Sequence, residues 1–144
     1  MFKQRLIPKL QMKATSFGSS KRMVLVTTVN FREVLEIGDP VSQAKIYQAQ
    51  FADELVFLDL DASAENRKTV VEVIRKAAQE IFMPITVGGG VRSVADFREL
   101  LSNGADKVSV NTAGVEHPDL INQASEVFGA QCVVLSIDYR KAED

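Results

Sequence analysis

The stretch ITVGGGVRSVADFRELLSNGADKVSV, residues 85–110, holds one complete strand–helix–strand unit and decides the class of fold. Its apolar run at 85–87 leads into three glycines, and residues 93–96, Ser-Val-Ala-Asp, have the spacing of a helix capping box. The helix is expected to end at Gly104, and another apolar run follows at 107–110. This order predicts neighbouring parallel strands joined by a crossover helix.

The same alternation of short apolar runs and longer segments of helical period extends along the whole chain. Asp39 followed by Pro40 signals a helix start, because aspartate caps helices and proline suits their first position. Further strands are expected at 5–10, 55–59 and 132–138, and further helices at 40–51, 64–80 and 118–128. The pattern amounts to four βα units and one additional strand.

The number of units determines how far the sheet can close. A (β/α)8 TIM barrel typically needs about 250 residues, so this 144-residue α/β chain predicts roughly a half-barrel. Residues 1–144 are expected to form one domain, with a long loop at 12–38 whose β-rich middle, 23–29, could form a hairpin-like flap. Half a barrel leaves sheet edges and one sheet face uncovered. Either the chain is a fragment that lacks a C-terminal half-barrel, or it forms a homo-oligomer.

The composition limits the classes of partner. With 46% hydrophobic and 25% charged residues the chain fits a soluble globular protein, and its formal charge of −2 leaves no basic stripe for nucleic acid. No apolar run is long enough to cross a membrane. The one cysteine, Cys132, lies in an apolar run and is expected to be a buried, unreactive thiol, which favours a cytoplasmic protein.

Glycines and polar residues are expected at the carboxyl ends of the strands, where α/β folds place their binding sites. Gly89 and Gly90 allow backbone N–H groups to approach an anion, and Asn111 and Thr112 lie just ahead of a helix start. These four residues form a candidate phosphate-binding site for a phosphorylated ligand. The alternative is that the glycines only form a tight turn between strand and helix.

Carboxylates follow two other strands. Asp138 ends an apolar strand, where it is either a general acid or base or a hydrogen-bonded turn aspartate. Asp59 and Asp61 could suit a metal, but loop anchoring is favoured because no third ligand is evident nearby. His117 precedes Pro118 and is expected only at a helix start, so the sequence predicts neither a metal site nor a cofactor.

Charged residues occupy the opposite, amino-terminal ends of the strands. Arg5, Glu54 and Lys107 lie there, and Lys107 shares strand parity with Ser109 and Asn111. If those faces point inward, charges of both signs surround one mouth of the barrel. The alternative is ordinary solvated charge, which at this end of a barrel serves stability.

Six runs of the sequence together resemble the cyclase subunit of imidazole glycerol phosphate synthase. They are RLIP (5–8), IGDPV (37–41), DELVFLDLDAS (53–63), PITVGGGVRS (84–93), GADKVSVNTAGVEHP (104–118) and VFGAQCVVLSID (127–138). The resemblance implies a (β/α)8 barrel subunit of histidine biosynthesis that receives ammonia from a glutaminase partner. In that family, ammonia and a phosphoribosyl-formimino carboxamide nucleotide give imidazole glycerol phosphate and an aminoimidazole carboxamide ribotide, a lyase reaction.

The resemblance also implies roles at the carboxyl ends of the strands. Gly90, Asn111 and Thr112 fall where the family binds one of its substrate's phosphates, and Asp138 falls on its second catalytic aspartate. The family's first strand ends in an aspartate that is its main general acid and base, whereas this chain has Gln11. An amide does not exchange a proton near neutral pH, which speaks against cyclase activity.

The amino-terminal ends receive roles from the resemblance as well. Arg5, Glu54 and Lys107 match three members of a charged gate through which ammonia enters the barrel. Asp106 falls where the family contacts its glutaminase. With this resemblance, an ammonia gate is favoured over ordinary stabilising charge.

Two further positions differ from the family. Lys9 replaces a small residue that usually lies inside the barrel, and a buried Lys9 is expected to pair with Asp138. Thr27 stands roughly where the family has a phosphate-contacting lysine. The favoured function is that of an ammonia-channelling paralogue, inactive as an enzyme on its own. The alternatives are a fragment of a genuine histidine-pathway cyclase and a non-catalytic, self-associating half-barrel that binds phosphate.

Overall fold

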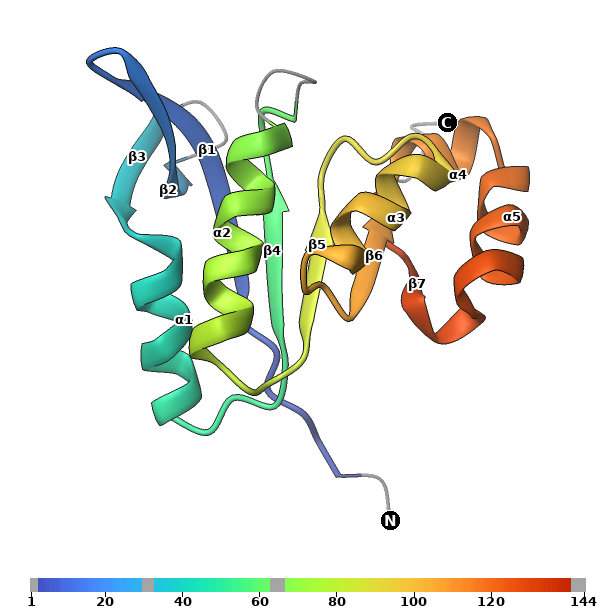
Figure 1. The fold of residues 1–144 in the computed structure, drawn as a ribbon, viewed down its shortest axis with the longest axis horizontal. Coiled ribbons are helices and arrows are strands. Elements are labelled where there is room, and N and C mark those ends of the chain that lie inside the picture. The colour runs from blue at the N-terminus through green and yellow to red at the C-terminus, as the bar shows by residue number, and fades with distance from the viewer. Residues whose placement is uncertain (1–2, 30–32, 63–66, 141–144) are drawn as a thin grey trace.

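The computed structural model describes residues 3–29, 33–62 and 67–140. Its centre is a seven-stranded sheet with the order β3-β2-β1-β4-β5-β6-β7 (Figure 1). Strands β1, β4, β5, β6 and β7 are parallel, whereas β2 and β3 are added in antiparallel fashion. The strands are β1 (Lys9–Phe17), β2 (Ser20–Val29), β3 (Glu33–Gly38), β4 (Leu55–Asp59), β5 (Ile85–Gly88), β6 (Lys107–Val110) and β7 (Val133–Leu135). The helices are α1 (Pro40–Ala49), α2 (Arg67–Glu80), α3 (Val94–Ser102), α4 (Thr112–Glu116) and α5 (Asp119–Phe128), followed by the short 3-10 helix η1 (Ala130–Cys132).

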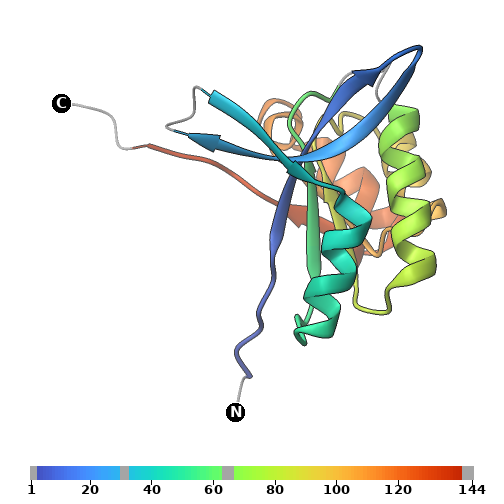
Figure 2. The same cartoon turned by 90° about the vertical axis from the view of Figure 1, so that its left-hand side faces the viewer.

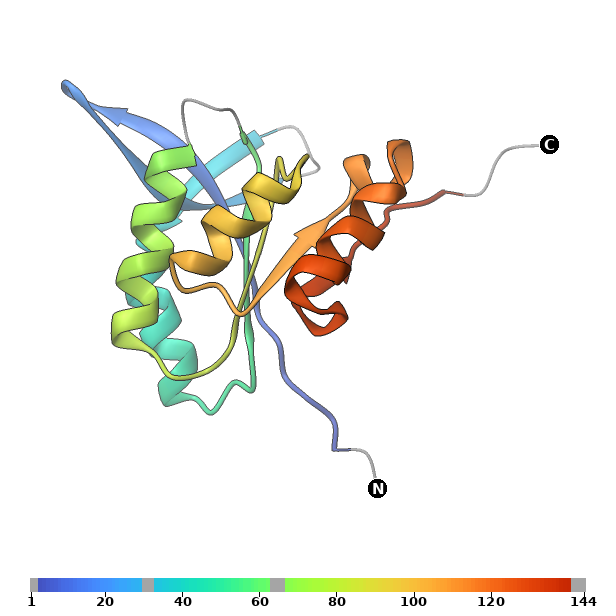
Figure 3. The ribbon, with the colours of Figure 1, turned by 45° about the vertical axis from the view of Figure 1, so that its right-hand side comes forward.

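Helices α1, α2 and α3 cover one face of the sheet and leave the other face open (Figure 2 and Figure 3). The alternation along β4 explains this arrangement. Leu55 and Phe57 are fully buried on the helix side, whereas Val56 and Leu58 line the open, concave face. Full burial of one such apolar side chain stabilises the fold by about 2 to 3 kcal/mol. The predicted partial (β/α)8 barrel is confirmed, and the barrel is not closed.

Local signals place the helix starts where the sequence predicts them. The Asp39 carboxylate accepts a hydrogen bond from Ser42 N at 2.8 Å, and Pro40 is the first residue of α1. At α3, Ser93 and Asp96 cap each other's backbone N–H groups in a complete capping box. Each cap of this kind contributes about 1 kcal/mol.

The segment expected to be a long loop, 12–38, consists largely of strand. β1 pairs with β4 as far as Met12 and then continues to Phe17 against β2. Residues 23–26 of β2 are buried, so the segment expected to form a hairpin-like flap packs against the hydrophobic core. The strand signal was obscured because β1 changes neighbours in its middle. Residues 30–32 lie outside the described ranges.

The carboxyl-terminal part differs from expectation in smaller ways. A short helix, α4, follows Asn111 directly. Of the strand expected at 132–138 only Val133–Leu135 forms β7, because Cys132 belongs to η1 and residues 136–138 are not paired as strand. Cys132 is therefore half-buried, which corrects the prediction of a buried thiol. None of the helices in the described ranges has the length and apolar character needed to cross a bilayer.

The sheet has two edges at which backbone groups are open, one along the first half of β1 and one along β7. Leu6, Pro8 and Met12 bond to the β4 side through their carbonyl oxygens. The alternate residues Lys9 and Gln11 direct their backbone groups away from β4, because successive peptide groups of a strand point to opposite sides. Within the described residues β2 joins only from Met12 onward, so this stretch has no second neighbour.

Candidate functional site

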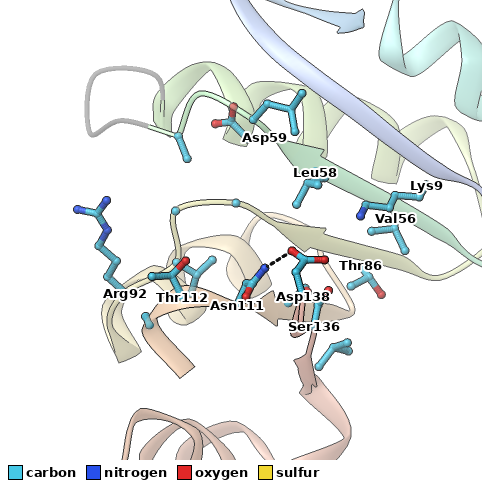
Figure 4. A pocket seen from close by; sticks show the side chains of 18 of the residues that line it. Lys9, Val56, Leu58, Asp59, Thr86, Arg92, Asn111, Thr112, Ser136 and Asp138 are labelled. Carbon is cyan, nitrogen blue, oxygen red and sulfur yellow. Dashed lines mark hydrogen bonds between the residues drawn. The ribbon is translucent and has the colours of Figure 1, made fainter. Parts of the chain in front are cut away.

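The concave face of the sheet forms a pocket of about 940 Å³ (Figure 4). It extends from the middle of the strands to their carboxyl ends. Gly89, Gly90, Asn111, Thr112 and Asp138 all contribute to its wall, so the structure brings together the candidate phosphate-binding residues and the candidate catalytic aspartate. A site that collects residues from three strand ends in one concavity is suited to binding a small polar ligand.

Gly89 and Gly90 are required by the turn that follows β5. Their φ angles are +106° and +60°, in the region that favours glycine. A Cβ on Gly89 would lie 2.2 Å from the Asp59 carbonyl oxygen, and one on Gly90 would lie 2.3 Å from Ala62 Cβ. Close packing of the β5–α3 turn against the end of β4 therefore explains both glycines. Phosphate binding by their N–H groups stays a prediction.

Arg67, at the start of α2, holds this turn in place and was not singled out from the sequence. Its guanidinium donates to the Gly90 carbonyl oxygen at 2.9 Å and lies 3.5 Å from a carboxylate oxygen of Asp96. The other Asp96 oxygen accepts from the backbone of Arg92 and Ser93. No local motif marks an arginine that reaches 23 residues along the chain, so sequence spacing alone could not have found it.

Asp138 is paired with an amide and not with a lysine. Asn111 Nδ2 donates to Asp138 Oδ2 at 2.8 Å, shown as the dashed line in Figure 4. Lys9 lies in the wall of the same pocket, but within the described residues it forms no ion pair or hydrogen bond with Asp138. The predicted Lys9–Asp138 pair is therefore wrong. Its premise, a buried Lys9, does not hold in the open half-barrel either, because Lys9 is exposed on the concave face.

Gln11 and Thr27, the other two positions at which the resemblance implies a difference from the family, lie on β1 and β2. Gln11 is half-buried and pairs with Leu58 of β4, so it follows Lys9 along the concave side of β1. Thr27 is exposed and pairs with Leu35 of β3, in the antiparallel extension of the sheet.

Asp59, at the end of β4, anchors its loop as predicted. Its carboxylate is 6% exposed and accepts from Asp61 N at 3.0 Å. Burial raises the pKa of Asp59, while the hydrogen bond from Asp61 and the nearby Arg67 charge oppose that rise. The Asp61 charge adds slightly to it. Asp59 therefore holds the turn that packs against Gly89.

Arg5, Glu54 and Lys107 converge at the amino-terminal end of the sheet. Glu54 is buried, and its two carboxylate oxygens accept separately, one from Arg5 and the other from Lys107 Nζ at 2.7 Å. This geometry favours the inward orientation inferred from strand parity over three separate solvated charges. That Arg5, Glu54 and Lys107 form an ammonia gate stays a prediction.

Two aspartates at this end bond to the strand before their own in the sheet. Asp106 accepts from Ile85 N at 2.7 Å and donates its own N–H to the Ile85 carbonyl at 2.8 Å. Asp53 makes the same pair of bonds with Leu6, at 2.8 and 2.9 Å. Asp106, expected at a partner interface, is exposed and also has this structural task. Asp53 was missed because its role depends on strand adjacency.

Known proteins resemble the chain from end to end. The model of the family described as histidine biosynthesis protein matches residues 7–143. Subunit HisF of imidazole glycerol phosphate synthase from Lactococcus lactis subsp. lactis is 51% identical over 144 residues, which cover 100% of this chain and 52% of that protein. The HisF subunit from Methanococcus vannielii is 47% identical over 141 residues, covering 98% of this chain and 49% of that protein.

The chain spans about half the length of the curated relatives it matches. The 144 residues of this chain that align with the Lactococcus lactis subunit include its strands, its glycine turn and its charged cluster. Similarity over 98 to 100% of the chain confirms the resemblance inferred from its six sequence runs. The chain belongs to the histidine biosynthesis protein family, in which it is similar to the HisF cyclase subunits.

Proposed function

We propose that this chain is an ammonia-receiving half-barrel of the HisF type, served by a glutaminase subunit and specialised away from cyclase catalysis. The observation that supports it best is the convergence of Arg5, Glu54 and Lys107 at the amino-terminal mouth of the concave face. Burying a carboxylate costs desolvation energy, and here Arg5 and Lys107 both contact the buried Glu54 carboxylate and offset that cost. Ammonia admitted at this mouth would move along the concave face toward the pocket.

The ligand of that pocket is proposed to be a phosphorylated small molecule. Gly89 and Gly90 line the pocket together with Asn111 and Thr112, and backbone N–H groups of glycines can approach an anion without interference from a Cβ atom. Asp138 lies beside Asn111 as the candidate acid or base. The resemblance implies that Gln11 stands where the family has its main proton-transferring aspartate, and an amide does not perform that proton transfer. The proposal is therefore binding and ammonia transfer without cyclase turnover, in the cytoplasm.

The open edges support completion of the barrel by a further half, either a second copy of this chain or a C-terminal half-barrel. Among the residues that the structure describes, no strand pairs with the backbone groups of Lys9 and Gln11 that point away from β4, and β7 forms the other open edge. Native mass measured in solution tests this step. A soluble monomer with no tendency to associate would contradict self-completion.

The central test is incubation of the full chain with ammonium salt and the formimino nucleotide, followed by mass spectrometry of the products. No imidazole product is expected. Turnover would overturn the proposal and support the second candidate, a genuine cyclase, which the retained Asp138 in the pocket favours. Calorimetric titration with a glutaminase subunit tests the ammonia-receiving part, and absence of binding would contradict it.

A further inference from the structure

Two phenylalanines protrude from neighbouring loops at the amino-terminal end of the sheet. Phe51, in the α1–β4 loop, is 90% exposed, and Phe82, in the α2–β5 loop, is 94% exposed. Gln48 ties the two loops together, since its backbone carbonyl accepts from Phe51 N at 3.0 Å and its side-chain carbonyl accepts from Phe82 N. Figure 1 shows both loops at the same lower end of the molecule as the incoming N-terminal segment. We call Phe51 and Phe82 the aromatic pair.

Neither ring packs in the core of this chain, so the stability of the fold does not explain a phenylalanine at either position. Phe51 has φ +62° and is the one non-glycine residue at positive φ within the described ranges. A bulky side chain is disfavoured in that conformation, and its exposure means that no packing within the chain compensates. Phe82 lies between the buried residues Ile81 and Met83, which direct it outward. Polar residues at both positions would suit the isolated chain better.

The aromatic pair lies at the same end of the sheet as the charged cluster. Phe51 is three residues before Glu54, whose carboxylate binds Arg5 and Lys107. Phe82 is three residues before Ile85, the first residue of β5, on the same end of the sheet. A mouth of paired charges beside exposed aromatic rings has the composition of a protein interface, in which aromatic anchors contribute much of the affinity.

We propose that the aromatic pair anchors the glutaminase subunit that covers the charged cluster, an inference that rests on the proposed function. Ammonia that escapes into bulk water at neutral pH becomes ammonium, so its transfer requires a water-excluding seal around the mouth. Two exposed rings at the same end of the sheet as that mouth are suited to contact the partner that forms the seal. The strained Phe51 is then explained by contact with the partner and not by the stability of this chain.

The test uses the full chain and the purified glutaminase subunit of the same organism, titrated by calorimetry. The variants are Phe51→Asn, which keeps a residue that tolerates positive φ, and Phe82→Ser. Each is expected to weaken binding by about tenfold or more, and both should retain the wild-type melting temperature. Phe17→Asn is the matched control, because Phe17 is 67% exposed at the opposite end of β1 and should bind the glutaminase as the wild type does.

The possible outcomes of this titration separate the inference about the aromatic pair from the proposed function. Wild-type affinity in both variants would overturn the anchor and leave the proposed function intact. A wild-type chain that does not bind the glutaminase would overturn both. Loss of self-association in the variants, measured by sedimentation with glutaminase affinity unchanged, would assign the aromatic pair to a contact between copies and also overturn the inference. If Phe82→Ser unfolds, Phe82→Gln and Phe51→Gly replace the pair of variants.

Discussion

Replacement of Glu54 with glutamine tests whether the charged cluster is a coupled unit. Glu54 is 8% exposed, and each of its carboxylate oxygens accepts from a different cation, Arg5 and Lys107. Glutamine keeps the size of the side chain but turns one acceptor into a donor that faces a positive charge. The Arg5 and Lys107 side chains are 57% and 30% exposed, so solvent screens the first pair more than the second.

These exposures set the expected magnitude. The Arg5 pair should contribute less than about 1 kcal/mol and the Lys107 pair about 1 to 2 kcal/mol, because its nitrogen is the more shielded. Glu54→Gln should therefore lower the free energy of unfolding by about 2 kcal/mol. For a domain of this size that corresponds to a melting temperature lower by roughly 6 °C. Urea unfolding at neutral pH, with the midpoint shifted and the slope unchanged, measures the loss.

The matched control is Glu36→Gln, which removes the exposed ion pair between Arg22 and Glu36 at 3.3 Å. That variant should change stability by less than about 0.5 kcal/mol. A double-mutant cycle of Glu54→Gln with Lys107→Met should give a coupling energy near 1 kcal/mol. Zero coupling, or a Glu54→Gln variant as stable as the wild type, would refute the reasoning that shielded charges hold the cluster together.

Three further predictions concern other residues. Gly90→Ala should destabilise the chain by about 2 kcal/mol or more in urea and weaken binding of inorganic phosphate, because its Cβ would meet Ala62 at positive φ. Burial raises the pKa of Asp59 in the folded protein above its value in the unfolded chain. Protonated Asp59 therefore stabilises the fold fully below the ordinary carboxyl pKa, and this contribution is lost as the pH rises through the folded-state pKa. The stability of the Asp59→Asn variant relative to the wild type should therefore increase as the pH rises above the ordinary carboxyl range, and unfolding midpoints measured in urea at a series of pH values check this. Asp106→Ala should lose about 1 to 2 kcal/mol by leaving Ile85 N without its acceptor, whereas Asp106→Asn should fold normally and isolate any loss of glutaminase affinity.

The parts of the fold that were predictable from sequence are those with local signals. The capping box at Ser93, the Asp39–Pro40 start and the apolar run at 55–59 each specify one element within a few residues. The extension of β1 was not predictable in the same way. Its second half exists because β2 pairs with it, and the partner strand is not marked by residues of β1 itself.

The same distinction separates the site residues. Strand parity was enough to bring Glu54 and Lys107 to one face, because alternation is a local property of a strand. The contact between Asn111 and Asp138 and the reach of Arg67 to Gly90 depend on distances across loops. Such contacts follow from packing of the finished fold, so no spacing rule along the chain reveals them.

One local arrangement, used twice, links the fold to the proposed gate. Asp53 bonds to Leu6, in the segment that leads into β1, and Asp106 bonds to Ile85 of β5, each through both its backbone N–H and its carboxylate. These bonds fix the register at the start of β4 and β6. The next residue, Glu54 or Lys107, must then point to the concave face, because neighbouring side chains alternate. The pairs Asp-Glu and Asp-Lys thus encode both the register and the position of the charge. Asp53→Ala should therefore reduce the coupling between Glu54 and Lys107 although both partners remain, and an undiminished coupling would show that the cluster positions itself.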